Sequence, residues 1–395
     1  MPQIARIQEE LRAAGIDGWL LYDFHNRDAI AYHVLGMDYG KFTSRRWFYW
    51  IPADGEPLKL AHKVEPTKLD KLPGEKRLYL SWRELHAGLR ELLGPARTVA
   101  MQYSPLANIP YVSTIDGGTV DLIRSLGYEV VSSAGLVQTF QAVLDEAAYH
   151  SHLAAGERVQ RIKDEAFALV GERLRAGATL TQYDLQQFIV RRFGEEGMTC
   201  MGEYPIVGTN EQTADPHFEP TPANARPIRQ GDTLLIDLWA KLDQPGAIFY
   251  DITWCGFVGS APPPKYVEIF HVVRDARDAA LAFIRDRYAK GEKLCGWEVD
   301  DACRSVVEKA GYGPYFLHRS GHSIGEKVHG NGVNIDNLET RDERELVPGI
   351  CFSIEPGIYL EGEMAVRSEI NVFITPDGTV DVAGAMQREL VLVDA

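Results

Sequence analysis

The chain has 395 residues, of which 56 are acidic and 41 basic, giving a formal net charge of −15. Its 45% hydrophobic and 25% charged residues are typical of a folded globular protein, and its length favours two domains. The negative charge argues against a nucleic-acid partner, and no apolar run approaches the roughly 18 residues of a membrane span. Five scattered cysteines without a CxxC pair indicate reduced thiols, so we expect a cytoplasmic protein without a signal peptide or a membrane partner.

The first third of the chain alternates short β-rich runs with helical patterns. Strands are predicted at 19–22, 47–51, 58–61, 77–80, 99–102 and 129–132. Helical spacing occurs between them, at 82–93 and 120–126. This alternation predicts an α/β layer domain over residues 1–143.

The pattern changes after a break at residues 133–145. Helices are predicted at 146–175, 179–196 with Thr181 as N-cap, 266–290 and 298–310. Strands are predicted at 233–240, 247–258, 350–355, 364–374 and 389–393. This order predicts an α+β domain with an antiparallel sheet over residues 144–395.

Two aspartates interrupt apolar strands in this second part. Asp237 lies in the run Thr233–Trp239 and Asp251 in the run Phe249–Trp254, with Gln244-Pro-Gly246 as turn residues between them. Either aspartate alone would equally fit a strand end that faces water. Two buried carboxylates, however, are too costly unless a cation compensates for them.

Two glutamates repeat this pattern near the C-terminus. Glu355 follows Ser353-Ile and precedes Pro-Gly357, while Glu369 ends the run Val366-Arg-Ser-Glu, and Gly362 marks a turn between them. Strand alternation places Arg367 on the face of Glu369. A surface ion pair of Arg367 with a glutamate would explain this strand, but it leaves Glu355 without a partner.

Three of the chain's 11 histidines, His318, His322 and His329, fall within 12 positions and alternate with glycines, which let a backbone approach a ligand closely. Four carboxylates and one imidazole form a hard, oxygen-rich donor set. Such a set suits Mn²⁺, with Co²⁺ or Zn²⁺ as alternatives. Carboxylates can also bridge two ions about 3.5–4 Å apart with a shared water between them.

At these residues the chain resembles metallopeptidase family M24, which includes Xaa-Pro dipeptidase (prolidase), aminopeptidase P, methionine aminopeptidase and creatinase. The likeness covers roughly residues 145–395, and Gly15-Ile-Asp-Gly-Trp19 with Asn26 resembles the start of the creatinase/prolidase N-terminal domain. The resemblance implies that a domain of this type is followed by a pita-bread catalytic domain. Since methionine aminopeptidase generally lacks the first domain, the dipeptidase and aminopeptidase P branches are favoured.

The resemblance also implies a ligand set for two divalent metal ions. The metal ligands it implies are Asp237, Asp251, His322, Glu355 and Glu369. It also implies that His217 and His329 contact the substrate, and we expect Glu355 to carry a proton to the leaving proline nitrogen. Arg367 would either bind a carboxylate or hold the metal glutamates.

The implied activity is hydrolysis of Xaa-Pro bonds in dipeptides. Aminopeptidase P activity on longer peptides is the alternative, and a non-peptidase relative of the fold is a third. The resemblance further implies a homodimer, with Trp47 or Trp50 reaching the neighbour's site. Three positions depart from the family pattern and bear on substrate range: Trp254 stands in place of Arg, Phe218 in place of Tyr and Ile370 in place of Asp.

Overall fold

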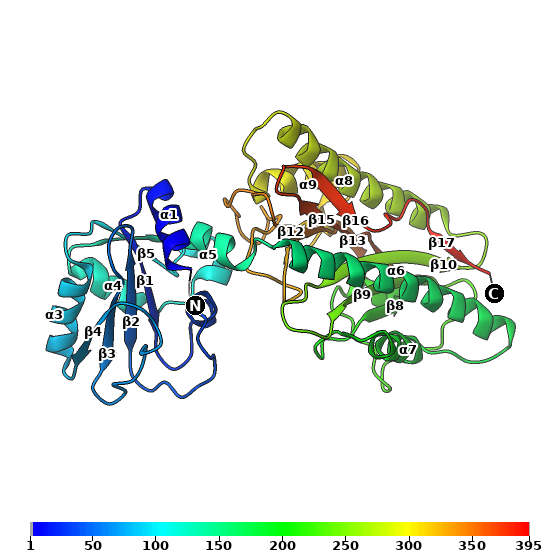
Figure 1. The fold of residues 1–395 in the computed structure, drawn as a ribbon. Helices are drawn as coiled ribbons and strands as arrows, with labels where there is room; N and C mark the ends of the chain where they lie inside the picture. The colour runs from blue at the N-terminus through cyan, green and yellow to red at the C-terminus, as the bar shows by residue number, and fades with distance from the viewer. Residues whose placement is uncertain (1–2, 395) are drawn as a thin grey trace. The chain divides into compact units, whose positions relative to one another are not determined.

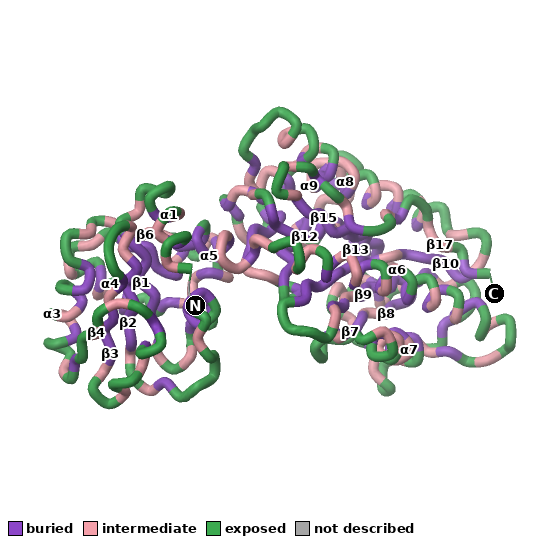
Figure 2. Tube along the Cα trace, viewed as in Figure 1, coloured by how far each residue is buried: buried purple, intermediate pink, exposed green. Residues whose placement is uncertain are grey.

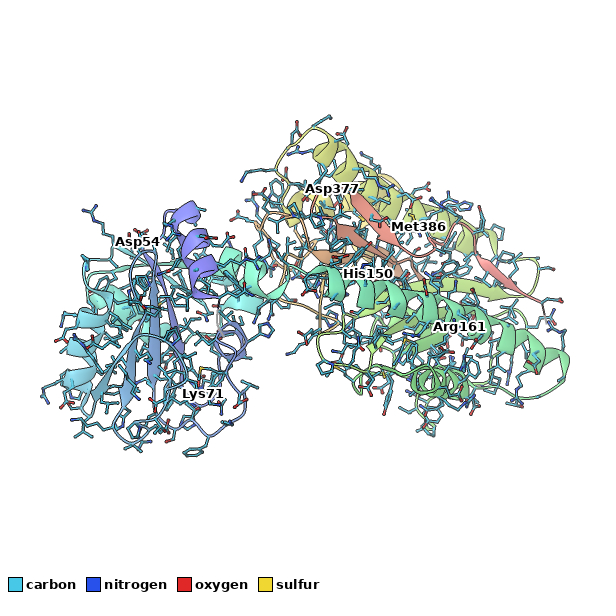
Figure 3. All side chains as sticks on the ribbon, in the orientation of Figure 1. Asp54, Lys71, His150, Arg161, Asp377 and Met386 are labelled. Atoms are coloured by element: carbon cyan, nitrogen blue, oxygen red, sulfur yellow. The ribbon has the colours of Figure 1, made fainter. Side chains whose placement is uncertain are left out.

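The computed structural model describes residues 3–394 and divides the chain into two compact units, Met1–Gln141 and Ala142–Ala395. Within this described range, no helix has the length and apolar character needed to cross a membrane. Charged side chains such as Asp54, Arg161 and Asp377 are exposed at the edges of their units (Figure 3).

The first unit is built on a mixed six-stranded sheet in the order β4-β3-β2-β1-β5-β6 (Figure 1). Its strands are β1 (Gly18–Asp23), β2 (Trp47–Pro52), β3 (Leu58–His62), β4 (Glu75–Tyr79), β5 (Thr98–Met101) and β6 (Glu129–Ser132). Its helices are α1 (Ile4–Ala14), α2 (Ala29–Val34), α3 (Trp82–Leu93), α4 (Gly117–Ser125) and α5 (Ala134–Gln141), with 3₁₀ turns at Pro105–Ala107 and Pro110–Val112.

Both faces of this sheet are buried at its central strands β1 and β2, whereas the edge strand β4 is largely exposed. Along β1, Trp19 and Leu21 belong to one apolar core and Leu20 and Tyr22 to another, because successive side chains of a strand point to opposite faces. Figure 2 shows these strands buried between exposed loops and helix surfaces. The α/β class expected for this part of the chain is therefore confirmed.

The two tryptophans of β2 correct one expectation. Trp47 is 1% and Trp50 3% exposed, and they pack into the two cores on opposite faces of the sheet. The expectation that either side chain reaches a neighbouring subunit is therefore wrong.

The second unit combines four long helices with several small sheets. The helices are α6 (Glu146–Arg175), α7 (Gln182–Glu195), α8 (Pro264–Ala289) and α9 (Gly296–Lys309), with 3₁₀ turns at Asn210–Ala214 and Gly313–Tyr315. The strands are β7 (Met198–Thr199), β8 (Ile206–Thr209), β9 (Thr233–Leu242), β10 (Tyr250–Val258), β11 (Ser323–Ile324), β12 (Cys351–Ile354), β13 (Gly357–Leu360), β14 (Met364–Arg367), β15 (Ile370–Ile374), β16 (Val380–Ala383) and β17 (Val391–Val393). Thr181 caps α7 as predicted, in a capping box with Asp184.

The hairpin of β9 and β10 lies beside α6 and has two different faces (Figure 1). Leu234, Ile236 and Leu238 belong to the apolar core that α6 and α7 share with the sheet. Asp237 and Trp239 alternate with them and point to the opposite face. One face of this hairpin therefore packs on the apolar core, and the other face places Asp237 in the interior of the unit.

The second predicted hairpin differs from the expectation. β12 pairs with β15, and the chain between them forms a hairpin of its own, β13 with β14. The single strand predicted over 364–374 is therefore interrupted at Ser368 and Glu369. Arg367 and Glu369 therefore approach the same region because the chain bends between β14 and β15, and not because their side chains share one face of a continuous strand.

Candidate metal centre

Side chains from distant parts of the second unit meet in one buried cluster. Ligand atoms of Asp251, His322 and Glu369 all lie within 4.8 Å of one another. Asp251 stands on β10, His322 directly precedes β11 and Glu369 directly precedes β15. All three are at most 4% exposed, so their charges are shielded from solvent.

The orientation of His322 leaves one ring nitrogen for the cluster. Its Nδ1 lies 3.2 Å from the carbonyl oxygen of Ser323, which can only accept a hydrogen bond, so Nδ1 carries the proton. Nε2 then lies 3.6 Å from Asp251 Oδ2 and 3.3 Å from Glu355 Oε1. An outer hydrogen bond that fixes the tautomer in this way is typical of metal-binding histidines.

Close backbone packing holds His322 beside Glu355. The backbone N–H of His322 donates to Ser353 Oγ at 2.9 Å, and that hydroxyl donates to Glu355 Oε1 at 3.1 Å. A Cβ on Gly321 would lie 2.0 Å from the carbonyl oxygen of Ser353. Glycine is therefore required where this segment crosses β12.

Asp237 joins the cluster through Arg367 and Thr253. Arg367 forms an ion pair with Asp237, and its Nε donates to Thr253 Oγ1 at 3.0 Å. Thr253 in turn donates to Glu369 Oε2 at 2.9 Å. Arg367 is 4% exposed, so the alternative of a surface ion pair with a glutamate is wrong.

A hydrogen-bonded chain behind this ion pair was not predicted from the sequence. Arg367 Nη1 donates to Tyr359 Oη at 2.8 Å. His318 Nδ1 donates to the carbonyl oxygen of Arg319 at 2.7 Å, so His318 Nε2 accepts from Tyr359 Oη at 2.8 Å. Tyr359 is four residues after Glu355, and this closeness in sequence to a candidate metal ligand was the available signal that Tyr359 belongs to the site.

Burial and like charges perturb the acidic groups. Burial raises the pKa of Asp237 despite Arg367, raises that of Asp251 to about 7 and raises that of Glu369 well above its usual range. Burial disfavours the charge of His322, but its contacts with Asp251 and Glu355 outweigh this and raise its pKa. For Glu355, the nearby imidazoles outweigh burial and lower the pKa.

Unpaired oxygens show that this donor set fits a cation. Asp237 Oδ1, Asp251 Oδ1 and Glu369 Oε1 are buried and have no hydrogen-bond partner among the described residues. Buried polar atoms are normally satisfied, and buried carboxylates normally bind a cation or a proton. The residues present therefore fit one or more divalent metal ions.

The two other predicted histidines lie on the solvent side of the cluster. The ring of His329 lies 4.4 Å from that of His322, measured between centroids, and His329 is exposed. Partial burial and His322 lower the pKa of His329, and a further contribution comes from His217. His217 itself is exposed, so it stands near His329 at the rim.

The three departures from the family pattern point away from the cluster or lie beside it. Trp254 belongs to the face of β10 that packs on α6, where the ammonium of Lys163 lies 3.4 Å from its ring centroid. Ile370 is 1% exposed and belongs to an apolar core. Phe218 is half-buried, directly after His217.

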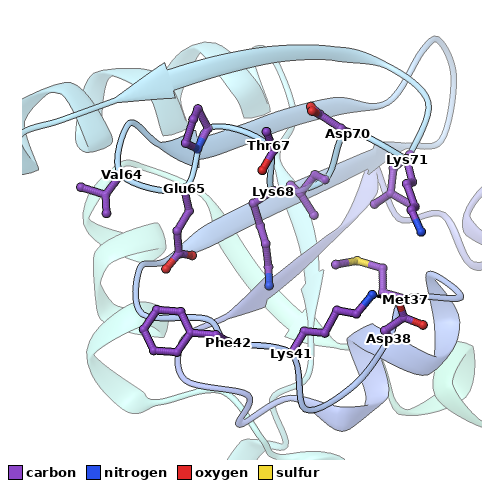
Figure 4. A pocket seen from close by; sticks show the side chains of 13 residues that line it. Met37, Asp38, Lys41, Phe42, Val64, Glu65, Thr67, Lys68, Asp70 and Lys71 are labelled. Carbon is purple, nitrogen blue, oxygen red and sulfur yellow. Dashed lines mark hydrogen bonds and ion pairs between the residues drawn. The ribbon is translucent and has the colours of Figure 1, made fainter.

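A separate cavity in the first unit has a different chemistry. It has a volume of about 490 Å³ and lies between segments 37–42 and 64–72 (Figure 4). Lys41, Lys68 and Lys71 extend into this region beside Phe42 and Met37. The described residues that line it include no histidine, and the acidic cluster belongs to the second unit, so this cavity is not the candidate metal site.

Comparison with known proteins identifies a matching family and several relatives. The model of metallopeptidase family M24 matches residues 155–376. The chain is 30% identical over 272 residues to the probable dipeptidase PepE of Mycobacterium tuberculosis, which covers 69% of this chain and 66% of PepE. It is 32% identical over 219 residues to the Xaa-Pro dipeptidase of Lactobacillus helveticus, covering 54% of each. These matches span less than two thirds of the relatives' lengths.

Similarity in structure covers more of the chain than similarity in sequence does. The crystal structure of dipeptidase PepE from Mycobacterium ulcerans is similar with a TM-score of 0.70, covering 99% of this chain and 96% of that chain at 24% identity. The expected order of a creatinase/prolidase-type N-terminal domain and a pita-bread catalytic domain is therefore confirmed.

Proposed function

The chain belongs to metallopeptidase family M24 and is a peptidase, and we propose that it hydrolyses Xaa-Pro dipeptides with two divalent metal ions. The observation that supports this most strongly is the buried cluster of Asp251, His322 and Glu369 with its unpaired carboxylate oxygens. The similarity to Xaa-Pro dipeptidase of Lactobacillus helveticus supports the choice of substrate.

The proposed metal ligands are the five residues that the family resemblance implies: Asp237, Asp251, His322, Glu355 and Glu369. We propose Mn²⁺ as the native metal, with Co²⁺ or Zn²⁺ as alternatives, because four carboxylates and one imidazole favour these ions. When bound, such ions polarise a scissile carbonyl and lower the pKa of a water.

Glu355 is placed to move the proton. Its lowered pKa keeps it ionised at neutral pH, and Ser353 holds one of its oxygens at 3.1 Å. A carboxylate in this state accepts a proton from the attacking water and delivers it to the leaving proline nitrogen. That nitrogen must gain a proton because an Xaa-Pro bond is a tertiary amide without an N–H.

The remaining predicted residues position the reactants. His329, beside His322, and His217 at the rim donate hydrogen bonds to the substrate and to the developing oxyanion. Arg367 holds Asp237 through their ion pair, so its role is to orient a metal ligand.

The test is to assay Ala-Pro beside Ala-Pro-Ala after chelation and re-addition of Mn²⁺, Co²⁺ or Zn²⁺. A dipeptidase cleaves Ala-Pro and leaves the tripeptide intact. Cleavage of the tripeptide would instead assign the aminopeptidase P activity. Hydrolysis of neither peptide with any of the three metals would overturn the proposal.

A homodimer in the cytoplasm completes the proposal. The five cysteines are all free, which supports a reducing compartment. The dimer rests on the family resemblance alone, and light scattering after size-exclusion chromatography distinguishes it from a monomer.

A further inference from the structure

Trp239 lies on the face of β9 that bears the metal-binding aspartate. It is two residues from Asp237, so both side chains leave the strand on the same side. Its cross-strand partner on β10 is Asp251, and side chains of directly paired residues have Cβ atoms about 4.5–5.5 Å apart. The indole is therefore an immediate neighbour of the Asp251 carboxylate.

A loop closes over the hairpin next to this indole. Lys241 Nζ donates to the carbonyl oxygen of Glu326 at 2.6 Å, and the backbone N–H of Phe249 donates to that of Gly325 at 3.0 Å. The loop continues through Val328, which belongs to the apolar cluster against which Trp239 packs. The next residue is His329, whose ring lies 4.4 Å from that of His322 between centroids, so this loop connects the surroundings of Trp239 with the acidic cluster.

The tryptophan on the other face of the hairpin gives a comparison. Trp254 packs against α6 and the ammonium of Lys163, away from the acidic cluster. Trp239 is also half-buried and also touches the core beside α6, but it packs in addition against the apolar cluster that contains Val328 and pairs with the proposed metal ligand Asp251. The indole N–H of Trp239 has no hydrogen-bond partner among the described residues, so the side chain acts through its apolar surface.

The position of Glu355 orients the dipeptide relative to Trp239. Glu355 follows β12 and contacts His322 at 3.3 Å, and in the proposed function it protonates the proline nitrogen. The N-terminal residue lies on the other side of the scissile bond. In the orientation proposed here, that residue extends from the cluster towards Asp251 and its cross-strand partner Trp239.

We propose that Trp239 is a specificity-determining residue that forms the wall of the pocket for the substrate's N-terminal side chain and restricts this pocket to small side chains. The inference rests on the proposed Xaa-Pro hydrolysis and adds which N-terminal residues are accepted. Small residues such as alanine fit beside the indole, whereas phenylalanine meets the ring.

The test compares kcat/KM for Phe-Pro and Ala-Pro in wild type, Trp239→Ala and Trp239→Phe. Removing an indole opens space for a large side chain, and pocket changes of this kind shift selectivity by about 10–100-fold. We expect the Phe-Pro to Ala-Pro ratio to rise by that factor in Trp239→Ala, and by less in Trp239→Phe. Trp254→Ala, on the opposite face of the same hairpin, is the matched control and should leave the ratio unchanged.

Each outcome bears on the proposal separately from the proposed function. An unchanged ratio in both Trp239 variants overturns the pocket assignment, as does an equal rise in the Trp254→Ala control. If Trp239→Ala does not fold, Trp239→Phe provides the test: its ratio of kcat/KM for Phe-Pro to kcat/KM for Ala-Pro should exceed that of the wild type. A wild type that cleaves neither dipeptide refutes the proposed function instead.

Discussion

Metal removal should destabilise this protein by an amount that follows from its unpaired oxygens. Asp237, Asp251 and Glu369 each keep one buried oxygen without a partner. An unsatisfied buried polar group costs about 1–3 kcal/mol, so three of them cost about 3–9 kcal/mol. Total stabilities of native proteins are about 5–15 kcal/mol, so the metal-free second unit should be close to unfolding.

Thermal unfolding with and without metal measures this effect. For a unit of this size, 1 kcal/mol shifts Tm by about 2–4 °C, so re-addition of Mn²⁺ to the chelated protein should raise Tm by on the order of 10 °C or more. Metal content, determined by elemental analysis, confirms removal and uptake.

The variant Asp251→Asn should have opposite effects on Tm in the metal-free and the metal-bound protein. Without metal, the neutral amide avoids the cost of a buried carboxylate, so the variant should unfold at a higher temperature than metal-free wild type. With Mn²⁺, it should unfold at a lower temperature, because a ligand is lost. Mn²⁺ uptake without a change in wild-type Tm, or a metal-free variant less stable than metal-free wild type, would refute the argument.

Three further predictions address single residues. Glu355→Gln should lower kcat for Ala-Pro by at least about 10²-fold with an unchanged circular dichroism spectrum, since an amide cannot carry the proton; near-normal turnover would remove Glu355 from the mechanism. Arg367→Met leaves Asp237 buried without its ion pair and should cost about 3–5 kcal/mol in urea unfolding; a cost below about 1 kcal/mol would contradict this. Burial raises the pKa of Asp28 to about 7 from about 3.9 in an unfolded chain, so the native state binds more protons between these values. The free energy of unfolding of the first unit should therefore fall by up to about 4 kcal/mol as pH rises from 4 to above 7. In Asp28→Asn, the difference between the urea unfolding midpoints measured at pH 5 and at pH 8 should become smaller.

Most of the longer helices and strands, and the residue types of the proposed site, could be predicted from the sequence. The predicted helix over 146–175 has the observed bounds of α6, because a long amphipathic run with Asp145 as N-cap determines both ends locally. Asp237 and Asp251 were found because each breaks an apolar strand. The helix α5 was missed in the supposed break at 133–145, where a short apolar stretch has no clear period.

The register of the strands and the contacts between residues far apart in the chain could not be predicted from the sequence. Asp251 pairs with Trp239 and Asp237 with Thr253, an offset that depends on the length of the turn, which the alternation of side chains does not specify. The ion pair of Arg367 with Asp237 joins residues 130 positions apart. Such a contact follows only from the packing of β14 on the β9–β10 hairpin.

The most direct test of the central claim is the number of Mn²⁺ equivalents needed to restore Ala-Pro hydrolysis to the chelated protein. We expect no hydrolysis without metal, and a rate that rises until two equivalents per chain are bound and then stays constant. Full activity of the metal-free protein, or no hydrolysis with any amount of Mn²⁺, Co²⁺ or Zn²⁺, would contradict it.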